Sequence, residues 1–322
     1  MIEESETTMP SGGILEPFAE LLGTKVENNR LVIPEQFGKG YSACFVFNEH
    51  IGMMINNHVL NREIAINPPA RNLSEQMVFF KFQNVIDSPN AVPAGGKVKE
   101  LPSVQVSTMG LNPSIVIPGK VNRASIYIVV DANYLRELIP SPDEIPVVQN
   151  ILRNNQLLLF EQIVSPTLQK IASEIVDETI DRSFELFFYR VKAEELICRL
   201  LIELRKREEK KVYPLNIQDI QTVYKVRERM FENLTATSTI EELSLFANMS
   251  QSKLKRLFRQ IFGDSIFSYY QDFRMKEAAR LLKEEKLSVS EVGYRLGFSN
   301  LSHFTEVFER HIGMKPKKYS RS

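Results

Sequence analysis

The chain has 322 residues, of which 43% are hydrophobic and 25% are charged, as in an ordinary globular protein of more than one domain. No apolar run approaches the ~20 residues that a membrane-spanning helix needs, and the acidic, polar start does not resemble a secretory signal. We therefore expect a cytoplasmic protein with no membrane partner. Cys44 and Cys198 lie far apart, which suits a reducing compartment, and each is expected to be a small buried side chain.

The formal charges are distributed unevenly although they sum to zero over the whole chain. Residues 213–322 contain 18 Lys and Arg against 13 Asp and Glu, a net charge of +5. Residues 1–212 contain 22 against 27, a net charge of −5. A basic C-terminal third joined to an acidic remainder favours a polyanionic partner for that end of the chain.

Residues 1–144 carry the pattern of a β-rich domain. Short apolar and β-branched runs, such as residues 77–86 and 124–131, alternate with turns rich in Gly, Pro and Asn,. Several short strands at this spacing are typical of a barrel or a sandwich. Aromatic side chains in these runs could line a ligand cavity, but filling a core is the simpler interpretation.

From residue 145 the hydrophobic period becomes helical. Ser165 and Pro166 mark one helix start, and a second apolar helix begins near Ser183 and ends in the charged run 205–211,. The two helices are predicted to form a hairpin. Its apolar stripe packs either on the domain's own sheet or in a dimer seam, and the stripe alone does not decide between them.

Residues 212–322 are predicted to be all helical and to contain one helical unit twice. Thr239 and Ser288 each precede a Glu three residues later, the pattern of a helix capping box,. The segments that follow, 250–263 and 299–313, share their apolar positions. Two short helices joined by a tight turn form a helix-turn-helix, whose second helix suits the major groove of DNA.

The alignment of the two copies places Ser250 on Ser299 and, after a one-residue insertion, Gly263 on Gly313. Between the copies, residues 265–285 are predicted to form one helix of about 31 Å at ~1.5 Å per residue. Because one turn of DNA is ~34 Å, such a helix would set two recognition helices in successive major grooves.

A recognisable residue pattern runs through the segment 216–321. It consists of Met249, Ser250, Ser252, Leu257, Phe258, Arg259, Gly263, Tyr270, Arg274, Ala278, Leu282, the LGFSN run 296–300, the SHF run 302–304, Phe308, Gly313, Pro316 and Tyr319. This pattern is the basis of a resemblance to the DNA-binding domain of the AraC/XylS family of bacterial transcription regulators. The resemblance implies a double helix-turn-helix and transcriptional control, leaning towards activation through RNA polymerase. It also implies an N-terminal domain, often cupin-like, that senses a signal or dimerises.

Carried over by position, the resemblance places three side chains of the first copy, Ser252, Lys255 and Arg256, towards base edges. Arg256 is the strongest candidate because a guanidinium can donate two hydrogen bonds to guanine. Lys253 and Arg259 are placed near phosphates, and a solvated helix face is the alternative for both.

The second copy departs from the family pattern because Glu306 and Glu309 stand where basic residues are usual. Its candidate DNA contacts are Asn300, Leu301, Ser302, His303, Thr305 and Glu306. Carboxylates repel phosphate, but Glu306 can accept a hydrogen bond from a cytosine amine. We expect the first copy to supply most of the affinity and the second to tune sequence choice or to face another protein.

Two smaller features belong to the same region. Gly293, where the family often has alanine, is expected to loosen its helix slightly. A basic tail either adds phosphate contacts or is a solvated terminus; it consists of Lys315, Lys317, Lys318 and Arg321.

An enzyme is the main rival class. His50, His58 and Glu63 lack the spacing of a metal site, and no phosphate-binding loop or hydrolase motif is present. We therefore expect neither catalysis nor a cofactor.

The sequence thus predicts an α+β multidomain protein. Residues 1–144 form a β-rich sensing domain, a cupin-like barrel or sandwich; residues 145–211 form a helical hairpin for dimerisation and linkage; residues 212–322 form an all-α double helix-turn-helix domain. The predicted function is sequence-specific binding of double-stranded DNA by a homodimeric transcription regulator that responds to an unidentified small-molecule effector. A ligand-independent regulator with a purely dimerising N-terminal domain is the alternative, and a cupin-type enzyme fused to a DNA-binding domain is a remote one.

Overall fold

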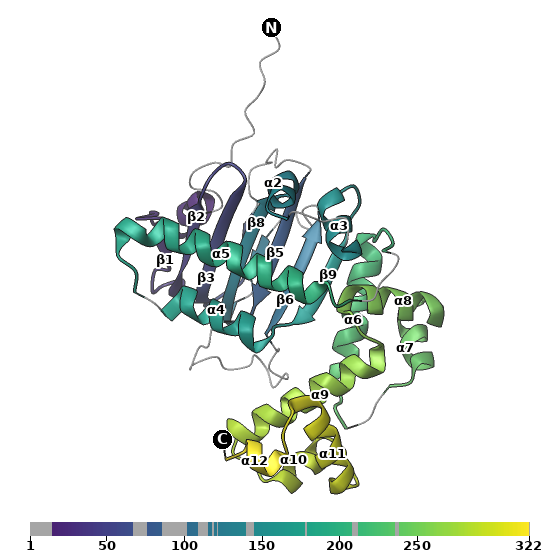
Figure 1. Ribbon diagram of the computed structural model, residues 1–322. Coiled ribbons are helices and arrows are strands. Elements are labelled where there is room, and N and C mark those ends of the chain that lie inside the picture. The colour runs from purple at the N-terminus through teal and green to yellow at the C-terminus, as the bar shows by residue number, and fades with distance from the viewer. Residues whose placement is uncertain are drawn as a thin grey trace. The chain divides into compact units, whose positions relative to one another are not determined.

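The computed structural model describes residues 15–66, 76–85, 102–108, 115–117, 119–120, 122–139, 145–177, 179–207, 212–235 and 238–321. The chain divides into two compact units, Met1–Leu215 and Asn216–Ser322 (Figure 1). The predicted domain boundary at residue 144 and the end of the charged run at 208–211 lie outside the described residues. In the part of the chain that is described, no helix has the length and apolar character needed to cross a membrane.

The N-terminal unit is built on one antiparallel sheet of seven strands in the order β1-β2-β3-β8-β5-β6-β9. The strands are β1 (Arg30–Val32), β2 (Gly38–Val46), β3 (Ile51–Leu60), β5 (Met77–Gln83), β6 (Ser103–Thr108), β8 (Asn122–Asp131) and β9 (Leu159–Ile163). A second sheet pairs β4 (Ile64–Ile66) with β7 (Ile115–Ile117). In β5, Val78, Phe80 and Phe82 alternate with Phe79 and Lys81, so that one face of the strand is fully buried,.

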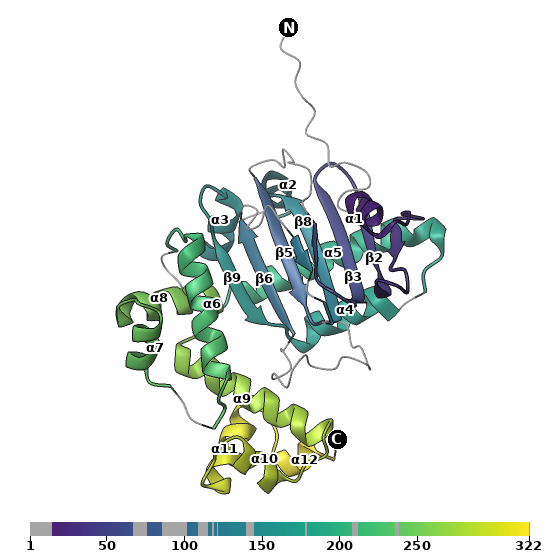
Figure 2. The same ribbon diagram turned by 180° about the vertical axis from the view of Figure 1, so that it is seen from behind.

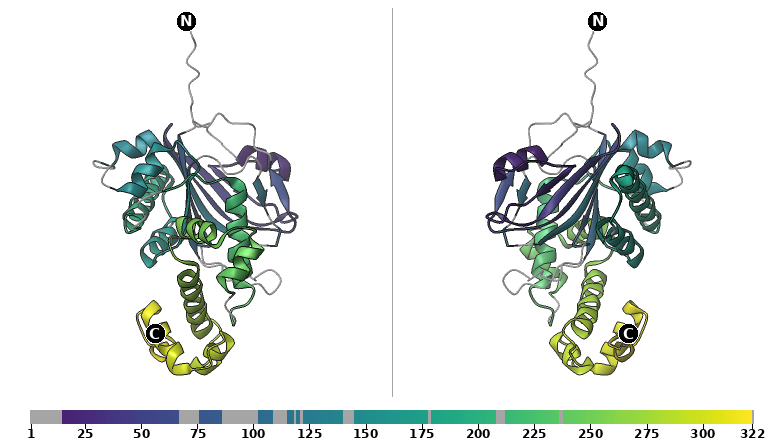
Figure 3. Two further views of the ribbon diagram at one scale, coloured as in Figure 1. Left: turned by 90° about the vertical axis from the view of Figure 1, so that its right-hand side faces the viewer. Right: turned by 90° about the vertical axis from the view of Figure 1, so that its left-hand side faces the viewer.

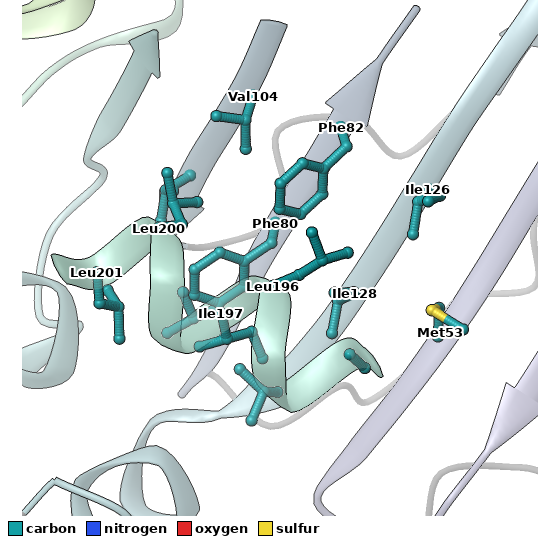
Figure 4. Packing of buried hydrophobic residues seen from close by; sticks show 14 of the residues in the cluster. Met53, Phe80, Phe82, Val104, Ile126, Ile128, Leu196, Ile197, Leu200 and Leu201 are labelled. Atoms are coloured by element: carbon teal, nitrogen blue, oxygen red, sulfur yellow. The ribbon is translucent and has the colours of Figure 1, made fainter. Parts of the chain in front are cut away.

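Helices cover that buried face. The unit contains α1 (Leu15–Leu22), α2 (Ala132–Glu137), α3 (Pro146–Arg153), α4 (Pro166–Asp177) and α5 (Arg182–Leu204). Helices α4 and α5 lie across the sheet (Figure 1), and Leu196 and Leu200 of α5 pack against Phe80 of β5 (Figure 4). The opposite face carries α1, whose Leu15 and Phe18 join a separate apolar cluster (Figure 2).

These observations confirm the predicted α+β organisation. In the described residues, helices α4 and α5 supply the second layer of the N-terminal unit in place of a second large sheet. Edge strand β9 lies inside the segment predicted to be helical. Its run of five residues, LFEQI, is too short for a hydrophobic period to separate strand from helix,.

The apolar stripe of α5 packs in part on the domain's own sheet, which is one of the two interpretations offered for it. Its C-terminal part packs on the domain's own sheet, whereas Phe184 and Phe187 near its start are 64% and 68% exposed. Cys198 is also exposed on this helix, so the expectation that it is buried was wrong. Cys198 lies between Ile197 and Arg199, and a helical turn rotates these three side chains to different faces.

The C-terminal unit is all helical, as predicted. It consists of α6 (Ile217–Phe231), α7 (Ile240–Phe246), α8 (Gln251–Phe262), α9 (Ile266–Lys283), α10 (Val289–Arg295), α11 (Leu301–Ile312) and α12 (Pro316–Tyr319). Helix α9 runs from the α6–α8 bundle to the α10–α12 bundle (Figure 3). It has 18 residues and is therefore about 27 Å long, shorter than the predicted helix because it ends at Lys283.

Candidate nucleic-acid interface

The first helix-turn-helix consists of α7 and α8, and local sequence signals fix the start of each helix and the end of α8. Thr239 accepts a hydrogen bond from the Glu242 backbone, and the Glu242 carboxylate accepts one from the Thr239 backbone, which completes the predicted capping box,. Ser250 caps α8 through the Lys253 N–H. Gly263 ends α8 at φ 80°, a left-handed conformation that glycine adopts without strain,.

Burial divides α8 into an inner and an outer face. Leu254, Leu257 and Phe258 are buried in the bundle core. The candidate contact residues Ser252, Lys255, Arg256 and Arg259 are all exposed. The inner face fixes the helix in place, and the outer face carries three cations and a hydroxyl.

The second helix-turn-helix, α10 and α11, repeats this construction. Ser288 and Glu291 form its capping box. Asn300 caps α11 by accepting hydrogen bonds from the backbones of Ser302 and His303, and Gly313 ends the helix at φ 82°. The side chains of Phe304, Val307 and Phe308 are buried, while those of Ser302, His303, Glu306 and Glu309 are exposed.

The caps correct the alignment of the two copies. Ser250 caps α8 and Asn300 caps α11, so Ser250 corresponds to Asn300 and not to Ser299. The one-residue insertion therefore lies in the turn before α11. With this register, four cationic positions of α8 fall on uncharged or acidic ones in α11: Lys253 on His303, Lys255 on Thr305, Arg256 on Glu306 and Arg259 on Glu309.

Lys253 faces α6 as well as solvent. Its Nζ lies 2.8 Å from Oδ1 of Asp219, and the two side chains are 41% and 15% exposed. Asp219 is itself held by Asn216, the cap of α6, whose amide donates to the other carboxylate oxygen at 2.9 Å. This pair ties the recognition helix to α6. No local sequence signal predicts this ion pair, because 34 residues separate the partners.

The outer face of α11 neutralises part of its own charge. Arg310 donates a hydrogen bond to Glu306 at 2.8 Å, and both side chains are 67% exposed. The hydroxyl of Thr305 donates to the Leu301 carbonyl at 2.9 Å. Of the six residues predicted to contact DNA here, Leu301 and Thr305 are half-buried and the other four are exposed.

Gly293 allows α10 and α11 to approach closely. A Cβ at this position would lie 2.6 Å from Cδ2 of Leu301 and 3.4 Å from Cδ1 of Phe304. The absence of a side chain therefore has a packing role at the helix crossing, in addition to the expected cost in helix propensity.

Polar contacts connect helix α9 to the segment that follows α6 and to the second copy. Tyr270 donates to the Asn233 carbonyl at 3.0 Å, and the Arg274 guanidinium donates to the Leu296 carbonyl in the turn of the second copy. Arg274 also lies 4.4 Å from the ring centre of Phe298. Burial lowers the pKa of Arg274. These contacts explain why Tyr270 and Arg274 belong to the residue pattern although neither lies on a recognition helix.

A charged cluster closes the C-terminal end of α9. Arg280 donates to Glu277 and Glu285, each at 2.8 Å, and Arg295 of α10 donates to Glu285 at 2.9 Å. Hydrogen bonding from Arg280 lowers the pKa of Glu285, and the hydrogen bonds to Glu277 and Glu285 raise the pKa of Arg280. The cluster joins α9 to α10 around the acidic residue between them.

In the described part of the chain, no three His, Cys, Asp or Glu side chains gather as metal ligands. His58 is buried in the N-terminal unit and shares a 3.1 Å hydrogen bond with Ser42. His58, one of the two histidines considered above for a metal site, thus takes part in a hydrogen bond inside the N-terminal unit.

The C-terminal unit also matches known proteins. Residues 243–322 match the family described as a helix-turn-helix domain. The transcriptional regulator GbdR of Pseudomonas aeruginosa is 32% identical over 88 residues, which are 27% of this chain and 24% of GbdR. The transcriptional activator RhaR of Yersinia pseudotuberculosis is 27% identical over 154 residues, 48% of this chain and 51% of RhaR. The match to GbdR thus spans about a quarter of that relative's length.

Solved structures give further matches. The DNA-binding domain of AdpA, solved with a target DNA, is 29% identical and has a TM-score of 0.29, covering 31% of this chain and 90% of that one. ToxT of Vibrio cholerae is 14% identical with a TM-score of 0.31, covering 84% of this chain and 98% of ToxT. The sequence matches, the residue pattern and the two capped helix-turn-helix units on α9 together identify the C-terminal unit as a domain of the AraC/XylS family.

Proposed function

We propose that the protein is a cytoplasmic, sequence-specific DNA-binding transcription regulator that reads DNA with α8 and α11. The observation that carries the proposal is the pair of helix-turn-helix units on one connecting helix, each with a polar, exposed outer face on its second helix. A single helix of this kind fits the major groove and can reach base edges. RhaR, one of the relatives, is named a transcriptional activator, which supports activation here.

In this proposal the first copy provides most of the affinity. The cations Lys255, Arg256 and Arg259 are exposed on α8 and meet the polyanionic duplex, where each phosphate contact releases counterions. Arg256 and Ser252 reach base edges. The second copy contributes mainly sequence choice through Ser302, His303 and Glu306, because its outer face carries more carboxylate than cation.

Dimerisation is proposed to occur through α5. Phe184, Phe187, Val191 and Ile202 are exposed apolar side chains on this helix. In an antiparallel pair of α5 helices, the acidic start of each, Asp181 and Glu185, would lie near the basic end of the other, Arg205 and Lys206,. This charge complementarity favours a second copy of the chain as the occupant.

The dimer proposal is tested by analytical ultracentrifugation of the full-length chain. Phe187→Asp should shift the protein from dimer to monomer, because it would bury a carboxylate in the apolar seam. Leu138→Asp, at a 49% exposed apolar residue that caps the C-terminal end of α2, is the matched control and should leave the dimer intact. A dimer that persists in Phe187→Asp would exclude this surface.

Signal sensing is proposed for the face of the sheet opposite α5. The register places Ser42 of β2, Asn56 of β3, Ser125 of β8 and Gln83 of β5 in one row. Ser42 donates to Asn56 at 2.8 Å, whereas the buried Ser125 hydroxyl has no hydrogen-bond partner among the described residues. Buried polar groups of this kind are normally satisfied, so a polar ligand at this row would supply the missing partner.

A ligand can control DNA binding only if it binds two states of the protein differently. The alternative is a ligand-independent regulator in which the N-terminal unit only dimerises. The variant Ser125→Val distinguishes the ligand-sensing regulator from the ligand-independent one. Loss of a response to a cellular signal with DNA binding retained supports sensing, whereas unchanged regulation supports the scaffold.

Regulation itself is tested by mapping chromosomal occupancy and transcription in cells that express the chain. The proposal predicts discrete occupied sites, altered transcription of adjacent genes, and loss of both in Arg256→Ala. Recruitment of RNA polymerase at those sites would establish activation. Uniform occupancy with no transcriptional change would refute the proposed function.

A further inference from the structure

The cations of the two copies occupy different helices. In the first copy, four cations lie on the recognition helix α8, and the next nine residues, 264–272, contain none. In the second copy, the matched positions of α11 carry no cation, and the next nine residues, 314–322, contain four: Lys315, Lys317, Lys318 and Arg321. Each copy is therefore associated with four cations. In the first copy they lie on α8, and in the second they lie at α12, the helix that follows α11.

The four cations at α12 form a cluster. Lys315, Lys317, Lys318 and Arg321 line a hollow of ≈ 510 Å³ at α12. The ion pairs near the end of the chain join Glu306 to Arg310 and Asp272 to His311 and Lys276. Among the described residues, none of the four clustered cations takes part in an ion pair with a carboxylate. Four like charges around one hollow repel one another unless an anion lies between them.

Packing holds the cluster in a fixed place on the second copy. Pro316 is buried at the start of α12, and the Tyr319 ring lies 5.7 Å from that of Phe308, a core residue of α11. Lys283 of α9 lies 4.9 Å from the centre of the Tyr319 ring. Helix α12 is thus anchored to the body of α11, and its cations do not belong to a loose terminus.

We propose that Lys315, Lys317, Lys318 and Arg321 form the phosphate anchor of the second helix-turn-helix and bind the sugar–phosphate backbone beside α11. This inference rests on the proposed DNA-binding function. Phosphate contacts supply affinity, whereas base contacts supply specificity. Because α12 supplies the phosphate contacts of the second copy, α11 can present Glu306 to a base edge without carrying the phosphate-binding cations itself.

The test is the salt dependence of DNA affinity, measured by fluorescence anisotropy with the full-length protein and a labelled duplex recovered from a random pool. Each phosphate contact contributes a slope of about −0.9 in log K against log salt. Lys317→Gln/Lys318→Gln should therefore reduce the magnitude of the slope by about 1.8 if both lysines bind phosphate. Sequence preference, measured as the affinity ratio of selected to scrambled duplex, should not change.

Two controls make the outcome specific. Lys39→Gln/Lys170→Gln removes two exposed lysines of the N-terminal unit and should leave the slope unchanged. Arg259→Gln removes an exposed cation of the first copy that is placed near phosphate, and it should reduce the magnitude of the slope by about 0.9. A slope that responds to Arg259→Gln but not to the α12 variant overturns this inference alone. Failure of the wild-type chain to bind any duplex overturns the proposed function as well. Thermal unfolding of the variants shows whether each is folded.

Discussion

The two helix-turn-helix units share a scaffold and differ in their surfaces. Both have a capping box before the first helix, a polar cap on the second and a left-handed glycine after it. Both bury a Phe at the same position, Phe258 in α8 and Phe308 in α11. On the outer faces, Arg256 in one copy is Glu306 in the other. Residues that cap or pack are thus retained because they fix the fold, whereas exposed residues are free to diverge in what they bind.

The largest expected effect comes from the residue that joins α9 to the second copy. Arg274→Met removes the hydrogen bond to the Leu296 carbonyl and leaves that buried acceptor unsatisfied, which should lower the free energy of unfolding by about 1.5–3 kcal/mol. Urea unfolding followed by circular dichroism measures the change. Arg229→Met, an exposed arginine on α6, is the control. Equal stability of both variants would show that the Arg274 contact does not hold the second copy in place.

The next effect concerns the recognition surface of the first copy. Arg256→Ala should weaken binding to the selected duplex by about 1–3 kcal/mol, the value of a good bidentate contact to a base. Discrimination at one base pair should be lost with it. Anisotropy titrations against duplexes substituted at each position measure both quantities. A uniform loss over all sequences would instead assign Arg256 to phosphate.

Variants of Lys253 and Asp219 test whether Lys253 has a structural role or contacts a phosphate. Because Asp219 holds its ammonium group at 2.8 Å, Lys253→Gln should leave the salt slope of DNA binding unchanged. Asp219→Asn should release the lysine and increase the magnitude of the slope by about 0.9. A fall of this size in Lys253→Gln would show that the lysine leaves Asp219 to bind phosphate.

Gly293→Ala should have a smaller effect on stability and a visible effect on the second copy. Alanine gains up to about 1 kcal/mol in helix propensity, but its Cβ requires the flexible end of Leu301 to move. We expect stability within about 1 kcal/mol of wild type and changed sequence preference only in the half of the site that α11 reads. Altered preference in the other half would contradict the division of labour between the copies.

The smallest effect is on the pH dependence of stability. Hydrogen bonding from Arg280 lowers the pKa of Glu285 in the folded chain. The ionised carboxylate therefore contributes stability above its unfolded pKa of 4.5, and this contribution is lost as the pH falls through the lowered folded value. Glu285→Gln should unfold at a lower temperature at neutral pH and converge with wild type in acid. Parallel curves at all pH values would rule out this linkage.

The helix ends and the repeat could be predicted from sequence because they depend on local signals. Capping boxes, terminal glycines and the Phe258–Phe308 correspondence are all readable within a few residues. Contacts between segments that are distant in the chain could not be predicted from the sequence. Lys253 and Asp219 meet only because α6 packs on α8, and α5 exposes Phe187 while burying Leu200 only because the sheet lies under one part of it. The register at Ser250 and Asn300 was missed because Ser299 matched by identity, whereas the hydrogen bonds define the cap.

The most direct test of the central claim is selection of bound sequences from a random duplex pool by the full-length wild type, Arg256→Ala and Glu306→Ala. If both copies read DNA, wild type should enrich two sequence boxes about one helical turn apart. Arg256→Ala should lose one box, and Glu306→Ala should change only the other. A single box in wild type that Glu306→Ala leaves unaltered would contradict base reading by the second copy.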